Sequence, residues 1–257
     1  MPMHYDHGRA DDHQVEEEGY FVSMTDMMVG LVFIFMILVM YFALQVSQER
    51  DRLLGANQTR TEILNNLQAK LKEKGVEVTL DTENGVLRLP DSILFDSGMA
   101  DLKADGVVAI GKLRDALLEV LPCYTSQTNG VPETRPTSCP DTPHRIESLY
   151  IEGHTDTDNL SGTGPIKDNW DLSVNRATNT YRLLAPADHA LTKMCAKHGD
   201  QCAPILSVSG YGPQRPIANG QTELDKQRNR RIDLRIVMIT PDSGETQRQI
   251  ESRIDGK

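Results

Sequence analysis

The densest hydrophobic pattern in the chain lies near its N-terminus. Residues 27–44 read MMVGLVFIFMILVMYFAL, which is 18 residues without a charge. A helix needs about 20 residues to cross a bilayer core of about 30 Å. Extending the run back to Tyr20 gives a long enough span over residues 20–46 and places Asp26 about six residues inside its start. The pattern therefore predicts one transmembrane helix that contains a carboxylate.

After this run, segments whose hydrophobic residues recur at helical spacing alternate with segments that have the spacing of strands. Leu64, Leu67 and Leu71 predict an amphipathic helix over residues 47–74, which either extends the membrane helix or pairs with a copy of itself. Gly75 ends that helix, and Asn84-Gly85 is typical of a hairpin turn. The other predicted elements are strands at 76–80, 86–89, 146–152, 205–209 and 231–239, and helices at 102–121, 169–184 and 187–197.

This order of elements predicts an α+β fold. Strands that alternate with helices, with a hairpin at one end, favour a two-layer α/β sandwich. We expect an acidic cytoplasmic tail at 1–19, the transmembrane helix at 20–46, an amphipathic linker at 47–75, the sandwich domain at 76–240 and a solvated tail at 241–257.

Charge is distributed unevenly. The chain has a formal net charge of −10, and its first 26 residues hold seven acids and Arg9, a local sum of 1 − 7 = −6. We expect this acidic tail to be solvated and disordered. The overall acidity argues against a nucleic-acid partner, and the lack of a basic n-region favours an uncleaved anchor over a secretory signal.

The four cysteines form two local pairs, each of which brackets a loop-like stretch. Disulfides Cys123–Cys139 and Cys195–Cys202 in an oxidising compartment are the natural interpretation, with four free thiols as the alternative. The arginine count, with Arg9 before the span and three arginines soon after it, would instead place the C-terminal part in the cytoplasm. We give the cysteines more weight and expect a periplasmic domain.

The sequence lacks the motifs of common enzymes. It has no G-x-S-x-G, P-loop or G-x-G-x-x-G, so we expect no enzymatic activity and no cofactor. The HTDTD run at residues 154–158 could supply a divalent cation site, but no calcium-type loop completes it, and we expect no metal. His154 is better interpreted as a structural or ligand-contacting residue than as a catalytic base.

Five ordered motifs carry a family resemblance. The segments ILFDSGMADL, YIEGHTDTDN, NWDLSVNRA, SGYGPQRPIAN and RNRRIDLRI resemble the OmpA-like peptidoglycan-binding domain over about residues 76–240, which implies a mixed sheet. A single membrane helix with an aspartate near its start is similar to MotB-type stator proteins. The acidic tail and the insertion between Cys123 and Cys139 look most like those of the anchored subunits of Zorya anti-phage defence systems.

The resemblance also implies a peptidoglycan site. Asp156 would accept the ammonium of diaminopimelate and Arg176 would pair with its carboxylate, and this pair of charges suits a zwitterionic ligand. The site would also include Asn169 at the family's amide position, Thr155 and Leu172.

Other interpretations of the same residues stay open. Asp156 and Arg176 could form an ion pair that only orients the helix. The loop at 157–168 is longer than the family pattern, and Trp170 stands where many relatives have a smaller residue. Arg230 and Arg231 would support the fold or the wall contact.

The function implied is that of a peptidoglycan-anchored stator subunit in the inner membrane with a cytoplasmic N-terminus. The resemblance implies a homodimer encircled by a pentamer of a multi-span ZorA-like subunit, with H⁺ or Na⁺ carried by Asp26. Ser23, Asp26 and Gly30 form a polar and small stripe that suits contact with such a partner. The alternatives are an N-cap role for Asp26, a flagellar stator, and a passive wall tether.

Overall fold

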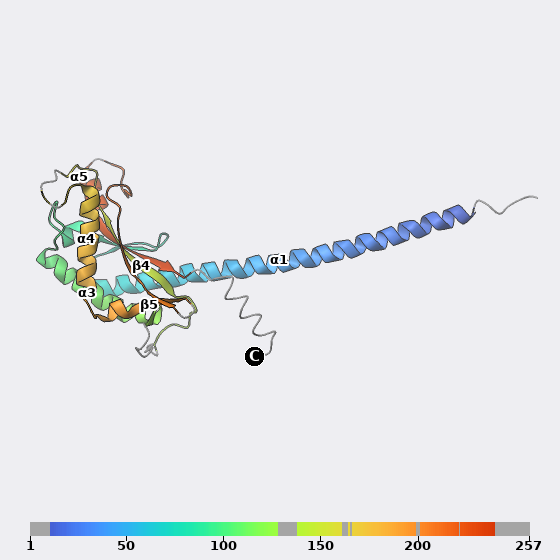
Figure 1. Ribbon diagram of the computed structural model, residues 1–257, viewed down its shortest axis with the longest axis horizontal. Helices are drawn as coiled ribbons and strands as arrows, with labels where there is room; N and C mark the ends of the chain where they lie inside the picture. Colours follow the sequence, from blue (N-terminus) through green and yellow to red (C-terminus); the bar gives the residue numbers. More distant parts are fainter. Residues whose placement is uncertain are drawn as a thin grey trace, which may run out of the picture. The chain divides into compact units, whose positions relative to one another are not determined.

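The computed structural model describes residues 11–127, 138–160, 164, 166–198, 201–220 and 222–239, with the side chains from Met24 onward. The predicted tail at 241–257 and the first ten residues lie outside this range. The chain divides into two compact units, Met1–Arg52 and Leu53–Lys257. Figure 1 shows the helix α1 (Asp11–Glu73) and the elements of the C-terminal unit.

The membrane candidate is the first part of α1. From Met24 onward α1 has an 18-residue window with a mean hydropathy of 2.7, and none of that window is buried. By length and composition this is the one helix in the described part of the chain that could cross a membrane. Because α1 begins at Asp11, part of the predicted tail is helical and Asp26 lies fifteen residues inside the helix.

The last part of α1 belongs to the folded domain. Ile63, Leu64, Leu67 and Leu71 are fully buried in the main hydrophobic core. The amphipathic face therefore packs within its own chain, which is one of the uses that an unpartnered apolar stripe can have. The compact unit begins at Leu53, earlier than the predicted domain start at residue 76. Gly75, at φ +72°, follows the end of the helix.

A mixed five-stranded sheet forms one layer of the domain. Its order is β1-β2-β8-β4-β7, with β4 and β7 parallel and the other neighbours antiparallel. The strands are β1 (Thr79–Asp81), β2 (Val86–Pro90), β4 (Ile146–His154), β7 (Leu206–Gly210) and β8 (Arg231–Met238). The β1–β2 turn has Gly85 at φ +72°, as expected for the predicted Asn84-Gly85 hairpin.

Helices pack on this sheet. The helices of the domain after α1 are α2 (Asp91–Leu94), α3 (Ala104–Val120), α4 (Asn169–Leu184) and α5 (Glu223–Asn229) in the described residues, and the short 3₁₀ turn η1 (Leu121–Cys123) follows α3. The helix α4 packs on β4 and β7, and α3 packs against α4 (Figure 1). The predicted α+β class with a membrane-length helix and a mixed sheet is confirmed.

The predicted helix at 187–197 is wrong. This segment forms a 3₁₀ turn, η2 (Ala190–Lys193), and then β5 (Met194–His198), which lies between β3 (Ser126–Gln127) and β6 (Gln201–Pro204) in a small antiparallel sheet. Burial of Met194, Cys195 and Ala196 and pairing with β6 outweigh the local helical pattern. The helix α5 was not predicted.

Both predicted disulfides are present. Cys123 is bonded to Cys139 and Cys195 to Cys202, which leaves no free cysteine. The second bond joins β5 to β6, so it staples the hairpin that replaced the predicted helix.

Close packing of α4 on β4 depends on Gly153. A Cβ at this position would lie 2.0 Å from the backbone oxygen of Ser173 on α4. We predict that Gly153→Ala destabilises the domain by roughly 1–3 kcal/mol, because the helix has to move away from the sheet. Urea unfolding measures this loss.

Gly111 provides the matched control. It lies inside α3, and a Cβ there would meet nothing within 4 Å. Gly111→Ala should leave stability unchanged or raise it by about 0.5–1 kcal/mol. Equal stabilities of the two variants would contradict the close contact between α4 and β4.

Candidate functional site

The predicted peptidoglycan site lies where β4 ends and α4 begins. Thr155 and Asp156 follow the last residue of β4, and Asn169 is the first residue of α4. The N-cap of α4 is Asp168, whose side chain accepts a hydrogen bond from the backbone N–H of Asp171. The site is thus built on the ends of two packed elements, which hold its side chains in place.

Asp156 is 8% exposed and is paired with Arg230, not with Arg176 as in the alternative in which Asp156 and Arg176 form an ion pair. Its Oδ2 accepts a hydrogen bond from Nη1 of Arg230 at 2.6 Å. Its Oδ1 accepts from the backbone N–H of Asp158 at 3.2 Å, which closes a local turn. Arg230 is the C-cap of α5 and also binds Glu223, the first residue of α5, at 2.7 Å, so Asp156 is tied to α5.

Arg176 is 1% exposed and is fully engaged by the segment that follows β2. Its Nη1 lies 3.0 Å from Oδ1 of Asp91, and its Nε donates to the carbonyl of Met99 at 2.8 Å. Its Nη2 donates to the carbonyl of Asp96 at 3.3 Å, and the guanidinium lies 5.0 Å from the centre of the Phe95 ring. The structure therefore does not pair Arg176 with Asp156.

The two ion pairs nevertheless form one cluster of alternating charge. Burial raises the pKa of the Asp91 carboxyl to about 6, with Asp156 adding to this rise and the Arg176 and Arg230 guanidiniums opposing it. Burial lowers the pKa of Arg176, and Asp91 and Asp156 act against that change. Two acids and two arginines in mutual reach offer partners of both signs, so a zwitterion could have each of its charges matched there.

The other predicted site residues have structural contacts. The Asn169 side chain donates to the carbonyls of Asp156 at 3.3 Å and Asp158 at 2.8 Å, so it holds the loop after β4. Leu172 is buried, and Thr155 is buried with a hydroxyl that has no hydrogen-bond partner among the described residues. Of the loop at 157–168, residues 161–163 and 165 lie outside the described part.

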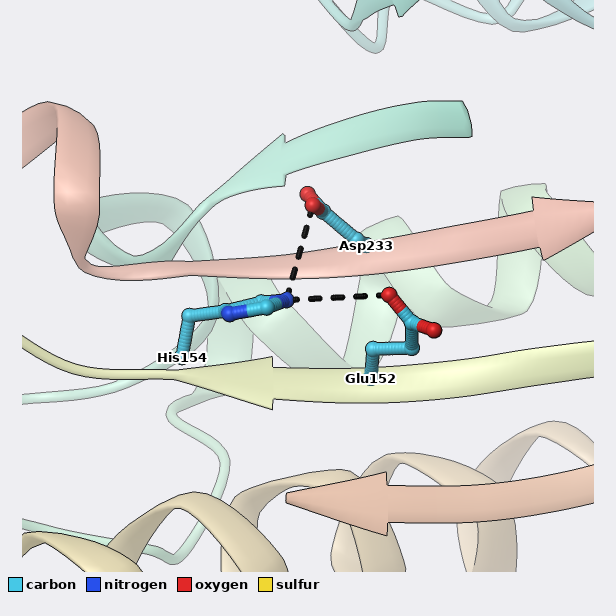
Figure 2. Close-up of side chains that lie close together, drawn as sticks. All are labelled: Glu152, His154 and Asp233. Atoms are coloured by element: carbon cyan, nitrogen blue, oxygen red, sulfur yellow. Dashed lines mark ion pairs between the residues drawn. The ribbon is translucent and has the colours of Figure 1, made fainter. Parts of the chain in front are cut away.

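A second cluster of titratable groups is buried on two neighbouring strands of the sheet, β4 and β8. Figure 2 shows Glu152 and His154 on β4 and Asp233 on β8, with Nε2 of His154 3.5 Å from Oδ2 of Asp233 and 3.8 Å from Oε2 of Glu152. All three residues are almost completely buried. The imidazole stacks on the Tyr211 ring at 5.4 Å between centroids. His154 is therefore a core residue and is out of reach of a substrate.

Arginines already compensate the carboxylates of this cluster. Arg235 binds Glu152 through two hydrogen bonds of 2.8 and 2.9 Å, and Arg231 binds Asp233 at 3.0 Å. Among the described residues this is the group that could present three ligand atoms to one metal ion. A divalent cation would add charge beside the arginines, so the donor set suits ion pairing better than metal binding.

The HTDTD run does not converge on an ion. Asp156 pairs with Arg230, and Asp158 pairs with Lys226 on α5 at 2.7 Å. Both acids therefore use lysine or arginine partners instead of sharing a cation.

Sequence reasoning missed Asp91 and gave Arg230 only a general supporting role. Asp91 is the first residue of the four-residue helix α2, in a segment that is otherwise largely apolar. The available signal was an acid directly after Pro90, in a segment that includes the buried Leu94 and Phe95, where a carboxylate needs a partner.

The Glu152–Arg235 pair generates a pH prediction. Burial alone would raise the pKa of Glu152, but its contacts with His154 and Arg235 lower it to about 2. A lowered pKa stabilises the fold above the unfolded value of 4.5, and this stability is lost as pH falls from 4.5 towards 2. Glu152→Gln should cost roughly 1–3 kcal/mol at pH 7 and flatten the decline of the melting temperature in that window.

Glu147→Gln is the control for this measurement, because Glu147 is a partly exposed acid on the same strand that pairs with His198 at the surface. It should leave the acid limb of the pH profile nearly unchanged. An unaltered profile for Glu152→Gln would contradict the assigned pKa shift.

Comparisons with known proteins find relatives of the MotB and Zorya types. No family model matches the chain. Motility protein B of Bacillus subtilis is 27% identical over 171 residues, which cover 65% of this chain and 52% of that protein. The chain thus spans about half the length of this relative. Zorya protein ZorB of Escherichia coli is 24% identical over 233 residues, which cover 86% of this chain and 89% of that protein.

Among solved structures, a MotB-like protein from Desulfovibrio vulgaris is 20% identical, with a TM-score of 0.47 and coverage of 76% of this chain and 97% of that one. The resemblance to MotB-type proteins that the motifs predicted is confirmed by the sequence relatives, and it extends over most of the chain to a Zorya protein.

Proposed function

We propose that the chain is the peptidoglycan-anchored subunit of an ion-driven, stator-like motor in the inner membrane, serving in anti-phage defence. The observation that carries this proposal is the extent of the similarity to ZorB. It covers 86% of the chain, whereas the unit Leu53–Lys257 accounts for 205 of 257 residues, or 80%. The similarity therefore reaches into the membrane helix as well as the folded domain. We propose no enzymatic step.

The expected orientation has a cytoplasmic N-terminus and a periplasmic domain. Two disulfides in the domain support this orientation, because such bonds persist in oxidising compartments. The proposed assembly is a homodimer of this chain inside a pentamer of a multi-span ZorA-like subunit. The homodimer would place two copies of Asp26 at the contact with that partner.

The position of Asp26 supports an ion-carrying role. An N-cap carboxylate has to stand at the beginning of a helix, whereas α1 begins at Asp11 and continues through Asp26 without a break. This position supports the ion-carrying role over the N-cap alternative. A carboxylate in the first part of a membrane span is costly when charged, which favours a functional role for Asp26 in the exchange of H⁺ or Na⁺ at a protein contact.

We predict that Asp26→Asn abolishes phage protection while the variant still co-purifies with its membrane partner and still binds peptidoglycan. Asparagine has the same shape as aspartate but does not titrate, so only ion exchange is removed. Protection is measured by plaque counts. Asp51→Asn, the same change farther along α1 and outside the apolar run, is the control and should protect normally. Full protection by Asp26→Asn would leave the passive tether as the better interpretation.

For the wall site we assign the ammonium of diaminopimelate to Asp156, in exchange for or beside the Arg230 guanidinium. Arg230 has a side chain that is 26% exposed and could meet the ligand's carboxylate. The near-complete burial of Arg176 supports a positioning role, in which it holds the segment from Asp91 to Met99 against α4. Asn169 and Thr155 would shape the loop that presents Asp156, with Leu172 packed beneath it.

We predict that Asp156→Ala weakens binding to isolated peptidoglycan sacculi by more than about tenfold, because a desolvated charge on the ligand loses its partner. Sedimentation of the protein with sacculi measures this loss. Asp158→Ala is the matched control, since Asp158 is a more exposed acid of the same loop that pairs with Lys226. Wild-type sedimentation of Asp156→Ala, with Asp158→Ala also normal, would contradict the assignment.

A further inference from the structure

The chain's single tryptophan lies beside the proposed wall site and is not used by it. Trp170 is the second residue of α4, directly after Asn169, and 46% of it is exposed. A large aromatic ring in water forgoes the burial that usually stabilises such a side chain. Its position at the edge of a charged site suits a ligand that would cover the exposed part of the ring.

One face of the indole is covered by backbone. A Cβ at Gly212 would lie 3.2 Å from Cδ2 of Trp170 and 3.4 Å from both Cγ and Cε2. These three neighbouring ring atoms are nearly equidistant from that point, so Gly212 lies against the face of the ring and not its edge. Gly212 has φ +51° and is buried, which suits a glycine that lets a ring approach the main chain.

Hydrogen bonds join the backbone of Trp170 to Thr155, the residue before Asp156. Ser173 donates from Oγ to the carbonyl of Trp170 at 2.9 Å and accepts from the backbone N–H of Gly212 at 3.0 Å. The carbonyl of Gly212 in turn accepts from the backbone N–H of Thr155 at 3.0 Å. The indole and the carboxylate are therefore carried by backbone segments that one connected set of hydrogen bonds holds together.

The chemistry of this edge suits a ligand with two different parts. Asp156 and Arg230 suit charged groups, whereas the outer face of the indole suits a flat, uncharged and partly apolar surface. Peptidoglycan carries both parts: its stem peptide has a zwitterionic diaminopimelate, and each pyranose ring of its glycan presents a face of C–H bonds.

We propose that Trp170 is a stacking platform for a sugar ring of the glycan strand whose stem peptide is held at Asp156. This inference rests on the proposed function and extends it from the peptide to the glycan. Trp170 makes the site specific for peptides that are still attached to sugar, which is the state of the stem peptide in an intact wall.

The single tryptophan makes a direct test possible. The full-length chain in detergent is titrated with a disaccharide–tripeptide that contains diaminopimelate and, separately, with the same tripeptide without sugars. We expect the first ligand to shift the tryptophan emission and to bind about three- to tenfold more tightly, as an aromatic contact of this kind allows. We expect the sugar-free tripeptide to leave the emission unchanged.

Calorimetry extends the test to variants without a tryptophan. In Trp170→Ala the affinity advantage of the disaccharide should disappear, while the affinity for the sugar-free tripeptide stays at the wild-type level. In the control Val107→Ala, a residue of α3 that is 44% exposed, the advantage should remain.

Each contrary outcome has a distinct meaning. Equal affinity of Trp170→Ala and wild type for the disaccharide ligand would overturn the stacking inference and leave the wall-anchor function standing. Failure of wild type to bind either ligand or sacculi would overturn both. An emission shift that follows protein concentration without any ligand would assign the indole to a second copy of this chain, and it would also overturn the inference.

Discussion

The buried guanidinium of Arg176 is the interaction on which the domain's functional edge depends. It carries a positive charge from α4 into the interior and binds Asp91 and the carbonyls of Asp96 and Met99. A buried charge of this kind is tolerated only when nearly all of its donors are satisfied. The segment after β2 is therefore held against α4 by these contacts and by the hydrogen bond from Asn179 to the carbonyl of Ala100.

That arrangement gives the site charged partners of both signs. The loop after β4 places Asp156 against Arg230, while Arg176 is bound by Asp91. Burial raises the pKa of Asp91 to about 6, which shows that its charge is costly even beside an arginine. A zwitterionic group can replace part of this network without changing its net charge. A purely anionic or purely cationic ligand would leave a charge without a partner.

The interior of the sheet follows the same rule. Glu152 on β4 and Asp233 on β8 face each other in the strand register and form ion pairs with Arg235 and Arg231, respectively. The His154 side chain lies close to both carboxylates (Figure 2). The cluster of acids and a histidine resembles a metal site by composition alone. The surrounding guanidiniums make it an ion-pair network that joins β4 and β8, at the end of β4 that continues into the loop of the proposed wall site.

The sequence by itself determined the features that depend on local pattern. An uncharged apolar run specifies a membrane-length helix, Asn84-Gly85 specifies a turn, and paired cysteines around short loops specify their own disulfides. Periodicity also located α4 from Asn169 to Leu184. The ordered motifs then identified the fold and the position of Asp156, because both rest on short contiguous segments.

Only the tertiary structure decided which charges meet. Arg176 and Asp91 are 85 positions apart, and Asp156 and Arg230 are 74 apart, so no local pattern could pair them. The β5 strand replaced a predicted helix because its pairing with β6 and its burial outweigh local propensity. The amphipathic end of α1 found its partner in the domain core and not in a second copy, since an apolar stripe specifies burial but not against what.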